Sequence, residues 1–177
     1  MNCKFINILD FETPYGVLVL GSFQNKLVLC DWKYRKSRIQ IDQRIKHYFN
    51  AEFKEQEDDV LTKTKAQLNS YFLGELKEFD VPYQLVGSVF QQQVWAALSA
   101  IPFGKTISYL QLSKSISNEK AIRAVASANG ANALSIIVPC HRVVGSNGEL
   151  TGYAGGIEAK KKLLSLEGSY LQRTMFN

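Results

Sequence analysis

Histidine and cysteine are scarce in this chain of 177 residues. It holds two histidines, His47 and His141, and three cysteines, Cys3, Cys30 and Cys140. Their odd number and wide spacing, with no Cys-x-x-Cys pair, argue against a disulfide framework. Cys3, Cys30 and His47 are fewer than the four ligands of a structural zinc site and lack their spacing. We therefore expect no metal, and no motif indicates another cofactor.

Long apolar runs are also missing. Charged and polar residues interrupt every candidate before it reaches membrane-spanning length. Residues Met1 to Phe5 carry neither an apolar signal core nor a small-residue cleavage site. We therefore expect a cytoplasmic protein that makes no use of a membrane.

Charge is distributed unevenly along the chain. Residues 1–82 hold 12 Lys/Arg and 12 Asp/Glu, whereas residues 83–177 hold 9 and 4, so the second part carries the whole net charge of +5. A positive excess suits a polyanionic partner such as nucleic acid. Solvated surface lysines would give the same count, so both interpretations stay open.

The sequence of the first part predicts a small α/β unit and shows no catalytic motif. The pattern favours a short edge strand, a hairpin that turns at Gln24-Asn25, and an amphipathic helix that ends at Gly74. The edge strand would span 4–9, the two strands of the hairpin 15–20 and 26–32, and the helix 60–73. Residues 40–50 fit a helix or a strand, and 52–59 fit a charged face or a loop. Pro82 marks the expected boundary, which gives domains 1–82 and 83–177.

The second part predicts mostly helices. A helix starts near Ser88, and Ser108 can cap a helix over 109–116. A turn at Ser117-Asn118 leads to a third helix over 119–128, and this pair suggests a helix-turn-helix. The third helix would display Arg123 among small residues, although such helix pairs also occur in proteins that bind no DNA. A last helix over 157–167 carries three consecutive lysines, 160–162, which we expect to be solvated.

A cysteine follows the most apolar run of this part. Ile136 to Val138 predict a short buried strand, which Pro139 ends because it lacks an N–H and holds its predecessor extended. Cys140 then lies where the chain leaves the sheet, directly before His141 and Arg142. A plain core cysteine is the alternative, but a core strand rarely places two such polar residues next to the residue it buries.

The same residues carry a family resemblance. Pro139-Cys140-His141-Arg142-Val143 after an aliphatic run resembles the signature of the O6-alkylguanine-DNA alkyltransferases, also called methylated-DNA–protein-cysteine methyltransferases. The resemblance extends from about Phe90 to Gly168. It includes five further blocks in order: Ile107-Ser108-Tyr109, Ala121-Ile122-Arg123-Ala124-Val125, Asn129-Gly130-Ala131-Asn132, Gly152-Tyr153-Ala154-Gly155-Gly156 and Leu163-Leu164-Ser165-Leu166-Glu167-Gly168.

This resemblance implies a fold and a reaction. The fold would be α/β (α+β), with a ribonuclease-H-like N-terminal domain and a mostly helical C-terminal domain whose short strand bears the cysteine. The reaction would be irreversible, stoichiometric transfer of an alkyl group from O6-alkylguanine, with O4-alkylthymine left open, to Cys140. His141 would act as a water-mediated base, Glu167 would orient it, and Asn132 would bridge the DNA-binding helix and the cysteine segment.

The resemblance also implies the contacts with the partner, a double-stranded DNA that contains O6-alkylguanine. Arg123 would enter the helix and Tyr109 would crowd the 3′ phosphate, with Ala124, Ser127 and Ser146 as further DNA contacts. The pocket for the extruded base would be formed by Tyr153, Ala154, Gly155, Val143 and Tyr109. The protein would act as a monomer.

Two other functions remain open from the residues themselves. A DNA-binding regulator would use the helix-turn-helix and leave damaged DNA unchanged. A cysteine hydrolase or acyltransferase would use Cys140 and His141 with turnover, and it would leave Arg123 and Tyr109 unexplained.

Overall fold

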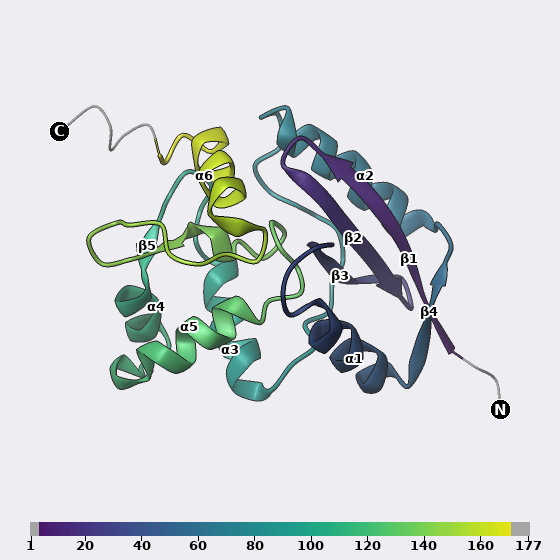
Figure 1. Ribbon diagram of the computed structural model, residues 1–177, viewed down its shortest axis with the longest axis horizontal. Helices are drawn as coiled ribbons and strands as arrows, with labels where there is room; N and C mark the ends of the chain where they lie inside the picture. The colour runs from purple at the N-terminus through teal and green to yellow at the C-terminus, as the bar shows by residue number, and fades with distance from the viewer. Residues whose placement is uncertain (1–3, 171–177) are drawn as a thin grey trace. The chain divides into compact units, whose positions relative to one another are not determined.

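The computed structural model describes residues 4–170 and divides the chain between Gly87 and Ser88 into two compact units (Figure 1). Among the described residues, no helix has the length and apolar character needed to cross a membrane.

A four-stranded sheet organises the first unit. Its strands are β1 (Lys4–Thr13), β2 (Gly16–Phe23), β3 (Lys26–Trp32) and β4 (Ala51–Glu55), in the order β3-β2-β1-β4. The predicted hairpin is confirmed, because Gln24 and Asn25 both adopt positive φ angles, 48° and 61°, as a tight primed turn requires. The predicted edge position of the first strand is wrong: β4 pairs with it in parallel on the side opposite β2.

Two helices pack within the first unit. Helix α1 (Arg38–Phe49) settles the ambiguity over 40–50, and it ends at Asn50 in the left-handed conformation. Helix α2 (Asp59–Phe72) is capped by Asp58, whose carboxylate accepts from the Leu61 N–H and from the side chains of Asn7 and Ser22. The cap therefore also ties the start of α2 to β1 and β2.

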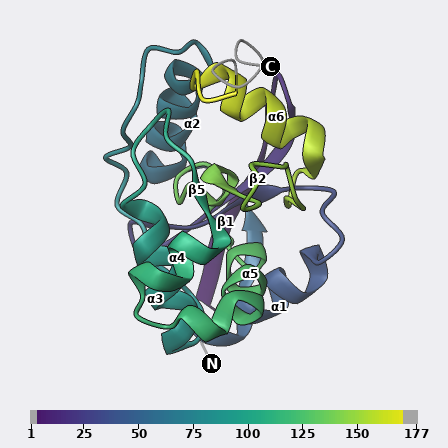
Figure 2. The ribbon, with the colours of Figure 1, turned by 90° about the vertical axis from the view of Figure 1, so that its left-hand side faces the viewer.

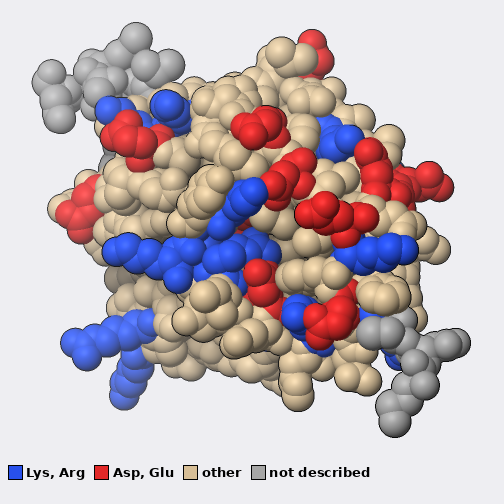
Figure 3. Space-filling view, turned by 45° about the vertical axis from the view of Figure 1, so that its right-hand side comes forward, with Lys and Arg blue, Asp and Glu red and all other residues tan. Residues whose placement is uncertain are grey.

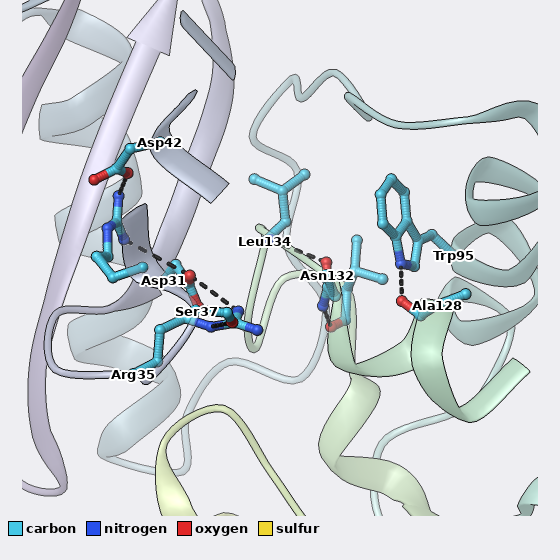
Figure 4. A network of polar contacts seen from close by, with 10 residues as sticks. Asp31, Arg35, Ser37, Asp42, Trp95, Ala128, Asn132 and Leu134 are labelled. Atoms are coloured by element: carbon cyan, nitrogen blue, oxygen red, sulfur yellow. Dashed lines mark hydrogen bonds and ion pairs between the residues drawn. The ribbon is translucent and has the colours of Figure 1, made fainter. Parts of the chain in front are cut away.

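The connection after β3 is anchored by a buried ion pair. Asp31 accepts two hydrogen bonds from the Arg35 guanidinium, at 2.9 and 3.0 Å, and Arg35 also donates to Ser37 (Figure 4). Burial raises the pKa of Asp31, and the charges of Arg35 and Arg38 oppose that rise. These bonds hold the start of the connection to the end of β3.

The boundary between the units lies beyond Pro82. The Leu27 N–H donates to the Pro82 carbonyl at 2.8 Å, and the Gln84 N–H donates to the Leu27 carbonyl at 2.9 Å. Residues on both sides of the proline therefore stay attached to β3, which explains why the first unit continues to Gly87.

The second unit consists mainly of short helices (Figures 1 and 2). Ser88 and Ser108 form complete capping boxes with Gln91 and Gln111 at the starts of α3 and α4. In chain order the elements are α3 (Val89–Ser99), β5 (Ile107–Ser108), α4 (Tyr109–Ser115), η1 (Glu119–Ala121), α5 (Ile122–Gly130), η2 (Cys140–Arg142), β6 (Val143–Val144) and α6 (Gly156–Leu166).

Helices α4 and α5 form the predicted pair. Ser117 turns the chain between them with a φ of 56°, and a single 3-10 turn, η1, precedes α5. The Trp95 indole N–H from α3 donates to the Ala128 carbonyl at 2.8 Å, which fixes the end of α5 against the core of the unit (Figure 4). The helix continues through Asn129 and Gly130, two residues beyond its predicted end at residue 128.

The predicted strand over 136–138 is wrong. Ile136 has a φ of 73°, which no strand residue adopts. The Val138 N–H donates to the Leu134 carbonyl and the Ile137 N–H to the Ser135 carbonyl, so the segment is a compact turn. The run is apolar because every residue in it is buried, and burial alone does not separate a strand from a folded loop. The short strand of this region is β6, which follows the cysteine and pairs with β5 in parallel.

Candidate active site

Cys140 opens the 3-10 turn η2, directly after the buried turn. Its side chain is nearly enclosed, with 3% of the residue exposed. The Cys140 N–H donates to the Val138 carbonyl at 2.8 Å. The sulfur therefore occupies a fixed position where only a ligand that enters the fold could reach it.

Asn132 holds the segment that precedes the cysteine. Its Nδ2 donates to the Val138 carbonyl at 2.9 Å, and its Oδ1 accepts from the Leu134 N–H at 2.9 Å (Figure 4). Asn132 lies two residues after the end of α5, so these two bonds join the helix pair to the turn that precedes Cys140.

His141 and Glu167 lie in contact in the interior. The distance between His141 Nε2 and Glu167 Oε1 is 2.8 Å, and both side chains are fully buried. The Glu167 carboxylate also accepts from the Arg142 guanidinium and from the Gly104 N–H.

Arg142 also binds the Glu167 carboxylate, although we predicted no role for it from the sequence. Its Nε donates to Glu167 Oε2 at 2.9 Å and its Nη2 to Glu167 Oε1 at 3.0 Å, while Nη1 donates to the Ile101 carbonyl at 2.6 Å. The guanidinium also stacks over the Phe103 ring. Its place directly after Cys140-His141 was the only signal in the sequence that could have indicated this clamp.

Burial and neighbouring charges shift the pKa values of Glu167 and His141. Burial raises the pKa of Glu167, but hydrogen bonds and charges from His141 and Arg142 outweigh burial and lower that pKa to about 2. Burial lowers the pKa of His141, against the opposing effect of Glu167. At neutral pH the pair is thus a carboxylate beside a neutral imidazole.

This state fixes the tautomer of the imidazole. An ionised carboxylate only accepts hydrogen bonds, so His141 Nε2 carries the hydrogen and Nδ1 carries the lone pair. Nδ1 is buried and has no hydrogen-bond partner among the described residues. His141 therefore keeps a basic nitrogen available beside the residue that bears the thiol.

Lys160 is not solvated, contrary to the expectation for its lysine run. Its side chain is 0% exposed, and Nζ donates to the Val143 carbonyl at 2.6 Å and to the Thr151 carbonyl at 3.1 Å. Burial lowers its pKa to about 8, an effect that the charge on Cys140 opposes. Lys161 and Lys162 are exposed, as predicted.

The residues predicted to face DNA lie at the surface of α5 and of the turn after β6. Arg123, Ala124 and Ser127 are exposed on α5, and Ser146 is exposed in the turn. Tyr109, the first residue of α4, is half-buried, and its hydroxyl lies 3.2 Å from Thr151 Oγ1. On the face drawn in Figure 3, basic and acidic side chains are interspersed over much of the surface, so charge of one sign does not mark that face as a whole.

The predicted pocket residues lie in two different settings. Tyr153, Ala154 and Gly155 are half-buried in the loop before α6, and the Tyr153 ring meets the His141 ring edge to face with centroids 6.2 Å apart. Val143 is fully buried in β6, and its carbonyl already accepts from Lys160. The loop residues and Tyr109 are therefore the predicted pocket residues that a ligand could meet at the surface.

No group of three or more His, Cys, Asp or Glu residues that could hold a metal occurs within residues 4–170. Of the three zinc candidates weighed from the sequence, Cys3 lies outside the described residues, Cys30 is buried in β3 and His47 is exposed on α1.

The site therefore combines a buried cysteine with a neighbouring histidine that contacts a carboxylate clamped by Arg142. Such a set is typical of proteins that use a thiol as a nucleophile. Comparison with known proteins specifies the class further. Residues 89–169 match the family model described as 6-O-methylguanine DNA methyltransferase, DNA binding domain.

Relatives match over nearly the whole chain. The methylated-DNA–protein-cysteine methyltransferase of Methanosarcina acetivorans is 44% identical over 160 residues, which cover 90% of this chain and 96% of the relative. The constitutive enzyme of that name from Bacillus subtilis is 41% identical, with coverage of 88% and 92%. The structure of Mycobacterium tuberculosis OGT in complex with DNA superimposes with a TM-score of 0.77 at 39% identity, covering 98% of this chain and 99% of that one.

The chain therefore belongs to the family of methylated-DNA–protein-cysteine methyltransferases, DNA-repair proteins that move an alkyl group from DNA to a cysteine of their own. This membership sets aside the pure regulator and the cysteine hydrolase as interpretations of the same residues.

Proposed function

We propose that Cys140 accepts the alkyl group directly from the O6 atom of an alkylated guanine in double-stranded DNA. The thiolate sulfur attacks the alkyl carbon, the carbon–O6 bond breaks, and the purine leaves with that bond's electron pair and is then protonated. Cys140 keeps the group as a thioether, so each chain reacts once. The observation that carries this proposal is the contact of His141 with Glu167 next to the buried cysteine.

The proton path begins at the thiol. A free thiol with a pKa of ~8.5 is only a few per cent ionised near neutral pH, so a base beside it raises the reactive fraction. His141 Nδ1 is the base in this proposal and takes the proton through a water molecule. Glu167 holds the imidazole in the required tautomer and stabilises the imidazolium that forms, while Arg142 and Asn132 keep the carboxylate and the cysteine segment in place.

The target base has to leave the duplex before it can meet an enclosed sulfur. Extrusion costs a few kcal/mol in unstacking and unpairing. In our proposal Arg123 enters the helix and fills the vacated space, while the small residues Ala124 and Ser127 let α5 approach the backbone closely. Tyr109 crowds the 3′ phosphate, and Ser146 makes a further DNA contact.

The extruded base is held by the loop before α6. We place Tyr153, Ala154 and Gly155 around it, with Tyr109 on the opposite wall and Val143 contributing through its backbone. In this proposal the protein acts as a monomer in the cytoplasm and uses no cofactor. O6-alkylguanine is the substrate, and O4-alkylthymine stays open as a second one.

Intact-mass measurement after mixing with duplex that contains O6-methylguanine tests this function. We expect the added mass of one CH2 group per chain, located on the peptide that holds Cys140, and no turnover beyond one equivalent. Cys140→Ser is the matched control, which should bind the duplex and stay unmodified. A modified peptide elsewhere, or catalytic turnover, would contradict the assignment.

A further inference from the structure

Thr151 connects two distant parts of the second unit. It lies between β6 and α6, and its carbonyl accepts from the buried Lys160 ammonium at 3.1 Å. Its Oγ1 lies 3.2 Å from the Tyr109 hydroxyl, a contact between residues 42 positions apart. Lys160 also donates to the Val143 carbonyl. The backbone of Thr151 is thus held from α6 while its side chain reaches the first residue of α4.

The Tyr109 hydroxyl has a second polar neighbour. Burial raises the pKa of Tyr109, and hydrogen bonds with Thr151 and Asn129 oppose that rise. The phenol therefore keeps its proton at neutral pH. The charge of Cys140 also acts on Tyr109, which places the phenol in the electrostatic surroundings of the reacting sulfur.

A phenol can accept one hydrogen bond and donate another. When Thr151 donates to the phenol oxygen, the phenol's own proton is left for a different acceptor. A donor that fixes the phenol's orientation decides which acceptor receives it.

We propose that Thr151 is a positioning residue for alkyl transfer, because its hydroxyl donates to the Tyr109 phenol and directs the phenol's proton toward the extruded base. The inference rests on the proposed function, in which Tyr109 forms part of the base pocket. As the alkyl carbon passes to sulfur, the departing purine gains the electron pair of the broken carbon–oxygen bond. A hydroxyl already aimed at the purine stabilises that charge without reorganising.

Two substitutions of Thr151 separate its hydroxyl from its shape. Thr151→Val keeps the branched shape and loses the hydroxyl, whereas Thr151→Ser keeps the hydroxyl and loses a methyl group. We expect Thr151→Val to lower the transfer rate at saturating DNA about 10-fold, the equivalent of one hydrogen bond, with little change in DNA affinity. Thr151→Ser should stay within about 3-fold of the parent protein. A larger loss of transfer rate in Thr151→Ser than in Thr151→Val would mean that Thr151 acts only through packing, and it would overturn the proposal.

Making the two Thr151 substitutions in a Tyr109→Phe protein measures the coupling between the two hydroxyl groups directly. Without the phenol hydroxyl, Thr151→Val should cause no additional loss of rate. An equal loss in both backgrounds would also overturn the proposal. If Tyr109→Phe reacts too slowly to time, the order of the Val and Ser variants decides alone. Failure of the proposed function would look different, because the parent protein would then leave Cys140 unmodified.

Discussion

Replacing Glu167 by Gln removes one charge from the most heavily bonded group of the site. The carboxylate accepts from His141, twice from Arg142 and from the Gly104 N–H. Gln keeps a single acceptor oxygen, and its NH2 group faces the N–H donors that bound the other carboxylate oxygen. Arg142 loses one acceptor whichever oxygen the NH2 group replaces, and the His141 Nε2–H also loses its acceptor when that oxygen is Oε1.

The loss of stability follows from the arginine. Breaking a buried ion pair on one side costs about 3–5 kcal/mol, because the remaining charge stays buried without compensation. The Ile101 carbonyl still accepts from Arg142, so we expect Glu167→Gln near the lower end of that range. Urea denaturation at neutral pH measures the difference.

The stabilisation that Glu167 provides depends on pH. The pKa of Glu167 falls from 4.5 to about 2 in the folded protein, so the unfolded chain binds the proton first as the pH decreases. Glu167 therefore contributes its full stabilisation above pH 4.5, of the order of 3 kcal/mol, and loses it as the pH falls toward 2. Glu167→Gln should lack this part of the acid loss.

The loss of activity follows from the histidine. A glutamine NH2 facing Nε2 favours the other tautomer, which places the hydrogen on Nδ1 and removes the base. Because positioned bases contribute about 10²–10⁴-fold, we expect the single-turnover transfer rate to fall by that order. Rapid-quench sampling with intact-mass detection measures it. A Glu167→Gln protein that transfers methyl within about 3-fold of the parent would refute the role of His141 as a base.

Three further changes test other parts of the site. Arg123→Ala should slow transfer from duplex at least about 10-fold while weakening DNA binding much less, and transfer from single-stranded DNA should change little; equal losses of rate and affinity would reduce Arg123 to a phosphate contact. Lys160→Met should abolish a gain of stability that the parent protein shows as the pH rises from about 8 to 10.5, since the folded protein releases this proton first; urea midpoints across that range, unchanged by the substitution, would contradict it. Gly104→Ala should lower the free energy of unfolding by at least about 1–3 kcal/mol, because φ is 73° and the new Cβ would lie 2.8 Å from the Glu167 carbonyl; a normal melting temperature would show that the loop adapts.

Local signals in the sequence predicted the elements that local physics determines. Ser88 and Ser108 begin helices because their hydroxyls accept from N–H groups three residues on, and such caps depend only on neighbouring residues. The turn at Gln24-Asn25 was equally predictable, because two short apolar runs flank a two-residue connection and pair as a hairpin.

Long-range contacts explain what the sequence could not predict. Lys160 is buried because two carbonyls, 17 and 9 residues away, converge on its ammonium. Arg142 meets its carboxylate 25 residues later in the chain. The run over 136–138 resembled a strand because its residues are buried, but Asn132 supplies bonds to Leu134 and Val138 that fold it into a turn. Composition alone carries no signal for any of these contacts.

The buried charges around Cys140 act together on the sulfur. With His141 neutral, Arg142 and Lys160 are positive and Glu167 is negative, so the set leaves one net positive charge. The charge on Cys140 supports the protonated form of Lys160 against the effect of burial, and the interaction is reciprocal, so the ammonium favours the thiolate. Arg142 is bound to Glu167 and contributes little net field, which leaves Lys160 as the cation without a carboxylate among its bonded partners. In the proposed reaction the Cys140 nucleophile therefore depends on two separate features: a base, His141, that removes the proton, and a buried cation, Lys160, that stabilises the thiolate.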